Sequence, residues 1–217
     1  MSHLGGRLSR LILASFLAVV STGKAAPPQT DVANRELANP EPIELYFLHY
    51  LLAGTEPPFR DLAKLDPAFR SANEFNRDAA LARAEADLRA KAETVKGVKF
   101  LEVNLEDAFG EYDSKYKEFD FTIGNGSRIS FGAFGRQINL VLTNGGLAQS
   151  WQLDPAEAQD VLRRTAGDRK VVLVLKLELI GAPPAASGTT LLSINTRILQ
   201  YEIRSRRNVR LGNIVVK

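Results

Sequence analysis

Apolar residues in the first part of the chain recur at the three- to four-residue spacing of an α-helix. The first such face ends at Gly54 and contains Leu45, Leu48, His49 and Leu52. A shorter helical segment follows, interrupted by the capping pair Asp66-Pro67. A longer helix over about 73–95 has an apolar stripe made mostly of alanine, where each buried methyl group contributes only about 0.8 kcal/mol. We expect residues 43–96 to be helical, with the long helix either closely packed or largely solvated.

From Gly97 onward, apolar and polar residues alternate, as they do in strands with one buried face. The Gly124-Asn125-Gly126 segment accepts positive φ, so we expect the strand around Phe121 to turn back there into the next strand. The last two predicted strands are the longest. The predicted strands cover residues 98–105, 119–123, 128–131, 137–142, 150–153, 170–180 and 190–204.

One short helix interrupts the strands, and its start is the clearest local signal in the sequence. Asp154 is at the N-cap, Pro155 is at the first helical position, and Glu157 is placed to bond back to the cap. The helix is expected to end at about Thr165. Because strands otherwise follow strands, the pattern favours an antiparallel sheet over a βαβ array. The predicted fold class is α+β, an N-terminal helical layer packed on an antiparallel β-sheet, with one short helix inserted before the C-terminal hairpin.

The first 25 residues have the composition of a secretory signal peptide. Arg7 and Arg10 precede an apolar run over 11–20, and small residues lead to a cleavage position after Ala25. The run is half as long as the roughly 20 residues that a membrane-spanning helix needs. We therefore predict an exported protein, periplasmic or secreted, with no integral membrane span after removal of the signal peptide. The alternative is that the peptide is retained.

Residues 26–42 contain Pro, Asn and Gln without an apolar period and are expected to form a disordered arm. Residues 43–217 are predicted to be one α+β domain, helical over 43–96 and mainly strands over 97–217. The 192 residues that follow Ala25 are enough for a buried core.

Composition and charge exclude several classes of protein. The chain has no cysteine, so disulfides and thiolate metal sites are excluded. Without the signal peptide, 25 basic and 25 acidic side chains remain, and the uniform basicity typical of nucleic-acid binding is absent. Residues 26–120 hold 12 basic and 19 acidic side chains, whereas residues 121–217 hold 13 and 6.

This unequal charge has two interpretations. The favoured one is that the two halves attract each other within the fold. The sharper one is an exposed basic patch that binds an anionic surface. The candidate residues of that patch are Arg204, Arg206, Arg207 and Arg210.

His49 is the one histidine that follows the predicted signal peptide, and it lies on the apolar face of the first helix. A lone histidine on an apolar face is typical of a packing residue. Without cysteine or a second histidine, a zinc site would need three or four carboxylates, so the sequence predicts no metal site and no cofactor. His49 remains a candidate catalytic residue, but no serine lies in a Gly-x-Ser-x-Gly motif, so the sequence shows no nucleophile that His49 would activate.

Carboxylates and aromatic side chains are interleaved between residues 102 and 120. Paired carboxylates beside aromatic platforms are what a glycoside hydrolase needs. The candidate catalytic acids are Glu111, Asp113 and Asp120, and the candidate binding residues are Tyr112 and Tyr116. The favoured alternative is a solvated acidic connection whose aromatic side chains cover the sheet, because such connections are ordinary and the sequence gives no carboxylate separation.

Four features follow one another between residues 97 and 204. They are the acidic aromatic strand, the Gly-Asn-Gly turn, the segment 151–158 with its Glu-Ala pair, and the basic-led apolar strand that begins at Arg169. In this order they resemble small exported bacterial domains of unknown function. The resemblance implies a bacterial envelope protein and transfers no catalytic residue.

The sequence thus favours a non-enzymatic binding or accessory protein of the bacterial envelope. Its expected partner is another envelope protein or an anionic envelope surface, and no nucleic acid is expected. The alternative is a carboxylate-dependent hydrolase that acts on envelope polymer or glycan.

Overall fold

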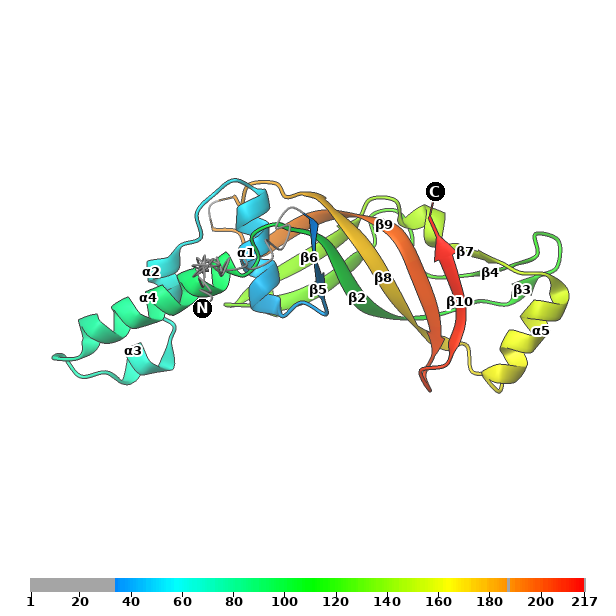
Figure 1. The fold of residues 1–217 in the computed structure, drawn as a ribbon, viewed down its shortest axis with the longest axis horizontal. Helices are drawn as coiled ribbons and strands as arrows, with labels where there is room; N and C mark the ends of the chain where they lie inside the picture. Colours follow the sequence, from blue (N-terminus) through cyan, green and yellow to red (C-terminus); the bar gives the residue numbers. More distant parts are fainter. Residues whose placement is uncertain (1–33, 187, 217) are drawn as a thin grey trace, which may run out of the picture. The chain divides into compact units, whose positions relative to one another are not determined.

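One long strand, β9 (Leu191–Ser205), is the centre of the largest sheet (Figure 1). Along one edge it pairs antiparallel with β8 (Lys170–Gly181), and β8 pairs antiparallel with β2 (Val98–Ala108). Beyond β2 lies β1 (Arg35–Ala38), which runs parallel to it. This side of the sheet therefore contains both pairing directions.

The other edge of β9 is shared by two strands. The first part of β9 pairs in parallel with β6 (Arg136–Leu142), which forms an antiparallel hairpin with β5 (Arg128–Ala133). The last part pairs antiparallel with β10 (Arg210–Val215). The prediction of an antiparallel sheet was wrong, because it assumed that neighbours in sequence pair with each other. β6 and β9 are separated by β7, α5 and β8 in the chain, and the return of the chain makes them parallel.

A side chain bridges the gap between β6 and β10 on this edge. The Asn144 amide nitrogen donates to the Ile198 carbonyl at 3.0 Å, and its Oδ1 accepts from the Ile198 N–H at 2.8 Å. On either side, the Thr143 N–H donates to Thr196 and the Val216 N–H donates to Leu199, both at 2.9 Å. The hydrogen-bonded edge of β9 therefore continues from one partner strand to the other.

A bulge at Leu199 changes which residues of β9 are buried. Ile198 lies opposite Leu177, but Gln200 lies opposite Lys176, so Leu199 is an extra residue. Buried positions are even-numbered before the bulge and odd-numbered after it, at 201, 203 and 205. The same face of β9 thus stays in the core over its whole length.

Helix α1 (Pro42–Leu52) supplies the main helical contacts with the sheet, against β5, β6 and β9. Six consecutive residues of α1, Leu45–Tyr50, are buried, so this part of the helix has no solvent-exposed side. The following helices pack mainly against one another, and Figure 1 shows α3 and α4 away from the sheet. They are α2 (Phe59–Ala63), α3 (Pro67–Ser71) and α4 (Arg77–Glu93).

The predicted helical layer is therefore formed largely by α1 alone. On α4 the buried residue is Ala84, and Leu88 and Ala92 are partly buried against the core. A surface made mostly of alanine buries too little area to hold a helix firmly on a sheet. The largely solvated alternative for the long helix agrees with the structure.

A small antiparallel sheet lies beside the last part of β9. It contains β3 (Tyr112–Asp113), β4 (Glu118–Asp120) and β7 (Ser150–Gln152). Aromatic rings connect this sheet to β9: Phe121 lies 6.2 Å from Trp151 and 6.3 Å from Tyr201 between ring centroids. The small sheet is thereby fixed to the core by ring packing.

The Gly124-Asn125-Gly126 segment does not form the predicted hairpin. β4 pairs with β3 and β7, whereas β5 pairs with β6. The segment packs instead on the 3₁₀ turn η2 (Gly145–Ala148), where the Gly146 N–H donates to Asn125 Oδ1 at 2.8 Å. A Cβ on Gly145 would lie 2.0 Å from the Gly124 carbonyl oxygen, so glycine is required by close approach of two backbones.

The predicted start of the short helix is confirmed. α5 (Pro155–Arg164) has Asp154 at its N-cap, and Asp154 and Glu157 form the reciprocal capping box. The Asp154 N–H donates to Glu157 Oε2 at 3.2 Å. The C-terminal residues Arg163 and Arg164 lie at the negative end of the helix dipole.

The structure, a computed structural model, describes residues 34–186 and 188–216. The predicted signal peptide and residues 26–33 of the predicted arm lie outside the described residues. Within the rest of that arm the prediction was wrong, because Arg35–Ala38 form β1 and pair with β2. Arg35 donates to the Thr94 carbonyl at 2.7 Å, and Asn39 accepts from Asn104 at 3.0 Å. These hydrogen bonds attach β1 to its neighbours, although the strand has few apolar side chains to bury.

Replacement of Asn144 by alanine should destabilise the fold by about 1–3 kcal/mol, because both backbone groups of the buried Ile198 lose their partner. Urea denaturation provides the measurement. Asn195→Ala on β9 is the control, since that residue keeps its place in the backbone ladder. Equal losses in the two variants would contradict a bridging role for the Asn144 amide.

Candidate functional site

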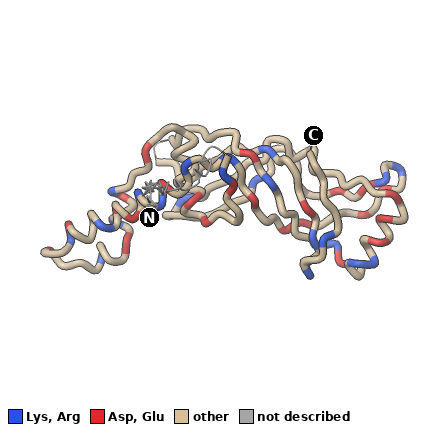
Figure 2. The backbone as a smooth tube through the Cα atoms, in the orientation of Figure 1, with Lys and Arg blue, Asp and Glu red and all other residues tan. Residues whose placement is uncertain are grey.

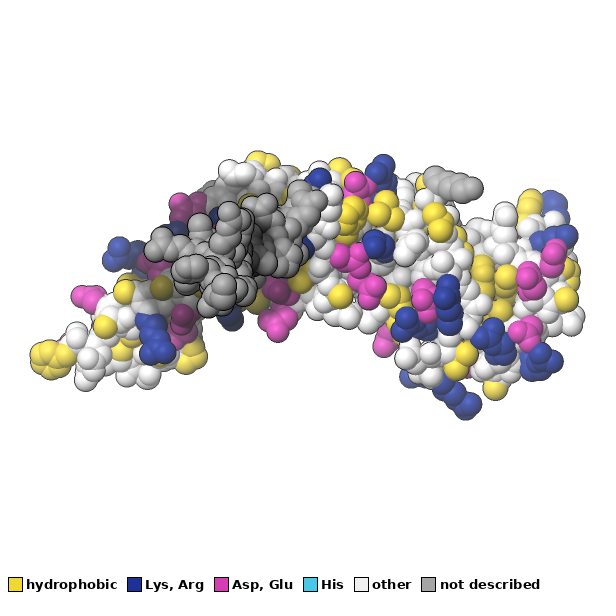
Figure 3. Space-filling model, viewed as in Figure 1, with side chains coloured by type: hydrophobic (Ala, Val, Ile, Leu, Met, Phe, Trp, Pro, Cys, Tyr) yellow, Lys and Arg dark blue, Asp and Glu magenta, His cyan; other side chains and the backbone are white. Residues whose placement is uncertain are grey.

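Basic side chains from three elements surround one pocket at the end of the large sheet. Figures 2 and 3 show Lys and Arg gathered around the β9–β10 turn and α5. The pocket has a volume of about 320 Å³, and its walls include Thr165, Ala166, Asp168 and Ser205. We call its four basic residues the basic groove: Arg164, Lys170, Arg206 and Arg207.

Local structure explains why these residues meet. Arg164 is the last residue of α5, and Lys170 is the first residue of β8. The Lys170 N–H donates to Asp168 Oδ1 at 3.0 Å, which fixes the loop between the two elements. Arg206 and Arg207 lie in the turn after β9, and the base of that turn is closed by hydrogen bonds between Ser205 and Val209.

A second pocket adjoins the first and shares Lys170 and Arg206 with it. Its volume is about 360 Å³, and its walls include Glu106 and Asp107 at the end of β2. Asp107 Oδ1 accepts from the Ala108 N–H at 2.8 Å and from the Thr122 hydroxyl at 2.5 Å. The basic groove therefore ends at an acidic wall.

The positive charge of the basic groove is largely uncompensated. Among the described residues, Lys170, Arg206 and Arg207 take part in no ion pair within 4.0 Å. Arg164 lies 3.9 Å from Asp160 and donates to the Arg210 carbonyl. Four cations thus share a pocket whose wall holds one carboxylate, Asp168.

The four predicted patch residues fall into two groups. Arg206 and Arg207 line the pocket, whereas Arg204 and Arg210 contact Glu202 at 2.7 and 3.9 Å. The hydrogen bond from Arg204 lowers the pKa of Glu202, and the same bond raises the pKa of Arg204. Both side chains are partly exposed to solvent, so this contact neutralises charge without contributing much stability.

Arg164 and Lys170 were missed by the sequence reasoning. Each ends or begins an element, and a basic residue at a helix C-terminus has a local electrostatic explanation. Their nearness to Arg206 and Arg207 depends on the pairing of β8 with β9, in which Val171 lies opposite Ser205. The sequence did offer one signal for these two residues: a basic helix C-terminus and a basic strand start are separated by only a short loop.

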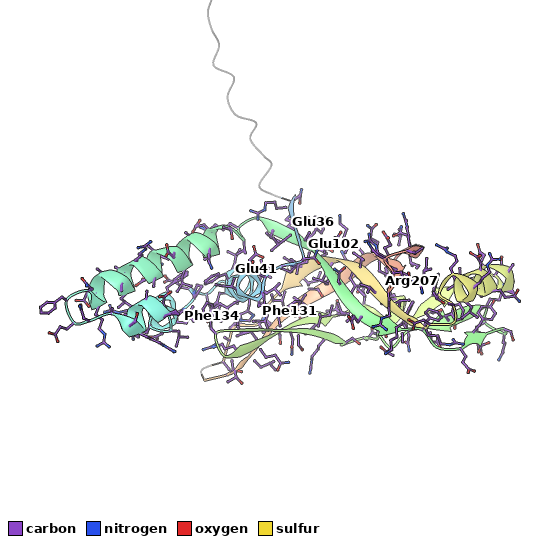
Figure 4. All side chains as sticks on the ribbon, turned by 90° about the horizontal axis from the view of Figure 1, so that it is seen from below. Glu36, Glu41, Glu102, Phe131, Phe134 and Arg207 are labelled. Atoms are coloured by element: carbon purple, nitrogen blue, oxygen red, sulfur yellow. The ribbon has the colours of Figure 1, made fainter. Side chains whose placement is uncertain are left out.

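His49 lies in a different part of the structure. It is 1% exposed, and its Nδ1 donates to the Ser193 carbonyl at 3.0 Å. Its Nε2 is buried and has no hydrogen-bond partner among the described residues. Burial lowers the pKa of His49, the nearby charge of Arg136 lowers it further, and the bond to Ser193 opposes both effects. Figure 4 shows Arg207 at the far end of the sheet from Phe134, which packs on α1 through Tyr46.

The acidic aromatic segment is used for structure at two of its candidate positions. Asp113 Oδ1 accepts from the N–H groups of Lys115 and Tyr116, at 2.7 and 3.1 Å, and so shapes the β3–β4 turn. The Tyr112 hydroxyl donates to the Leu153 carbonyl at 2.8 Å, and its ring packs on Phe119.

The remaining candidates of that segment are exposed and lie apart from the basic groove. Tyr116 is 58% exposed and lines a separate pocket with Lys117, Asp154 and Glu157. Glu111 and Asp120 are exposed, and neither they nor Asp113 line the two pockets at the end of the sheet. The structure therefore does not bring the candidate acids to the groove.

Within residues 34–186 and 188–216, no group of three or more His, Asp or Glu side chains is arranged to hold a metal ion. In the same part of the chain, no helix is both long and apolar enough to cross a bilayer. Comparisons with family models, curated proteins and solved structures find no match to this chain.

Acid should destabilise this protein partly through His49. The pKa of the folded imidazole lies below 6.5, so between that pKa and 6.5 the unfolded state binds more protons and the free energy of unfolding falls as pH decreases. His49→Gln removes this titration and leaves an amide that can donate to Ser193. We expect the urea midpoint to fall less in the variant than in the wild type between pH 7.5 and pH 5. Parallel losses would show that His49 does not contribute, because the carboxylates titrate in both proteins.

Proposed function

We propose that this protein is a non-enzymatic binding or accessory protein of the bacterial envelope, and that the residues of its basic groove bind an anionic envelope surface. The observation that carries the proposal is the convergence of four basic side chains on a pocket with one carboxylate in its wall. Export and a bacterial origin rest on the sequence, through the apolar run over 11–20 and the resemblance over 97–204.

The electrostatics support binding more than catalysis. Exposed cations without acidic partners keep their attraction for an external anion, whereas Arg204 and Arg210 have part of theirs cancelled by Glu202. The groove is also open to a surface, because Arg206 and Arg207 are exposed on a turn between two strands. A flat anionic surface can reach both side chains without a change in the fold.

The hydrolase alternative has less support. Asp113 is engaged in a turn, and His49 is buried with its Nδ1 bonded to the backbone. Paired carboxylates in a glycosidase must flank the same bond in a cleft. Glu106 and Asp107 do line one pocket together, but they share it with Lys170 and Arg206, and Asp107 Oδ1 already accepts from Ala108 and Thr122.

Binding to vesicles tests the proposal. The protein should bind phosphatidylcholine vesicles that contain phosphatidylglycerol and should release them as sodium chloride increases, because salt screens surface charge. Arg206→Gln combined with Arg207→Gln should weaken binding roughly thirtyfold, at about 1 kcal/mol for each basic residue near an anionic surface.

The matched control is Arg70→Gln combined with Arg83→Gln. These two arginines are exposed on α3 and α4, and their replacement causes the same change in net charge. If both double variants lose affinity equally, binding depends on net charge and the groove has no special role. If the wild type binds no better to anionic than to neutral vesicles, the proposed function is wrong.

A further inference from the structure

The basic groove has more positive charge than a single carboxylate requires. Arg164, Arg206 and Arg207 each present a guanidinium group, and Lys170 adds an ammonium group around the same pocket of about 320 Å³. Asp168 is the carboxylate in its wall, and its Oδ1 already accepts from the Lys170 N–H. A ligand that balances this charge must itself carry more than one negative charge.

The groove is also short. Its continuation beyond Lys170 and Arg206 meets Glu106 and Asp107, and the exposed Glu106 would repel an extended polyanion that lay along the sheet. High positive charge in a short site favours a compact anion of high charge density over a long acidic chain.

The chemistry of the basic side chains restricts the class of anion further. A guanidinium group offers a planar fork of donors that matches two oxygens of one phosphate or carboxylate. A phosphomonoester has three terminal oxygens and a charge between −1.5 and −2 at about neutral pH, which suits several forks at once. A phosphodiester has two terminal oxygens and one charge, and a carboxylate has the same number of each.

We propose that the basic groove is a binding site for a phosphomonoester group. This inference rests on the proposed function and specifies the chemistry of its ligand. The group could be carried on the head of an envelope lipid or belong to a free phosphorylated molecule, and the recognition chemistry is the same in both cases. Arg206 and Arg207 supply forks from the turn. Arg164, whose guanidinium group already donates to the Arg210 carbonyl, and Lys170 add positive charge from α5 and β8.

Two vesicle types of equal surface charge test the proposal, one containing phosphatidic acid, a phosphomonoester lipid, and the other phosphatidylglycerol, a phosphodiester lipid. The wild type should bind the first at least roughly fivefold more tightly. Arg206→Lys combined with Arg207→Lys keeps the charge and removes two forks, so it should abolish this preference and leave binding to phosphatidylglycerol nearly unchanged. Circular dichroism and the urea midpoint establish that the variant is folded.

Free anions identify the source of the group. Inorganic phosphate should bind more tightly as pH rises from about 5 to about 8, because it gains most of its second negative charge over this range, whereas inorganic sulfate keeps its charge. The carboxylates of Asp168, Glu106 and Asp107 in the groove walls face either anion, so any pH effect that acts through them would change the binding of phosphate and of sulfate alike. Displacement of the protein from phosphatidic acid vesicles by phosphate supports a free phosphorylated ligand. Preference for phosphatidic acid without displacement supports a lipid head group.

The outcomes separate this inference from the proposed function. Equal binding to the two anionic vesicles, reduced by Arg206→Gln with Arg207→Gln, would overturn the phosphomonoester site and leave anionic surface binding in place. Binding to neither vesicle would overturn both.

Discussion

The rest of the structure depends on the requirement that β9 be hydrogen-bonded along both edges while one of its faces stays in the core. β8 covers one edge of β9 from Asn195 to Ser205, and β6, the Asn144 side chain and β10 cover the other in succession. Unpaired backbone groups in a buried strand are costly, which explains why an amide side chain replaces a strand at Ile198. The bulge at Leu199 then keeps Tyr201 and Ile203 on the buried face.

The position of the basic groove follows from this strand. Ser205 ends β9 and lies opposite Val171, which brings the β9–β10 turn beside the start of β8. Tyr201 packs through Phe121 on the aromatic rings of the small sheet, and β7 in that sheet leads directly into α5. Rigid ring packing thereby fixes the helix whose last residue is Arg164. The cations are held near one another by the core below them, so their mutual repulsion is overcome by packing energy.

Several elements could be predicted because their signals are local. The capping box at Asp154, the apolar face of α1 and the strand alternation of β6 and β8 are each encoded within a few residues. The interpretation of His49 as a packing residue used the same kind of signal, and the structure places it in the core. By contrast, the prediction of a Gly-Asn-Gly hairpin was wrong, because glycine also serves where two backbones approach closely, as at Gly145 against Gly124.

By itself the sequence determined the helices and strands other than β1, β3 and β10, the absence of disulfides and the excess of basic residues in the second half, since these depend on residue type and short-range spacing. Only the tertiary structure decided that β6 pairs in parallel with β9, that Arg35–Ala38 form a strand, and that Arg164 and Lys170 join Arg206 and Arg207. It also decided that Arg204 and Arg210 face Glu202. The physical reason is that pairing and charge compensation depend on which distant segments meet, and that is settled by burial of the whole core.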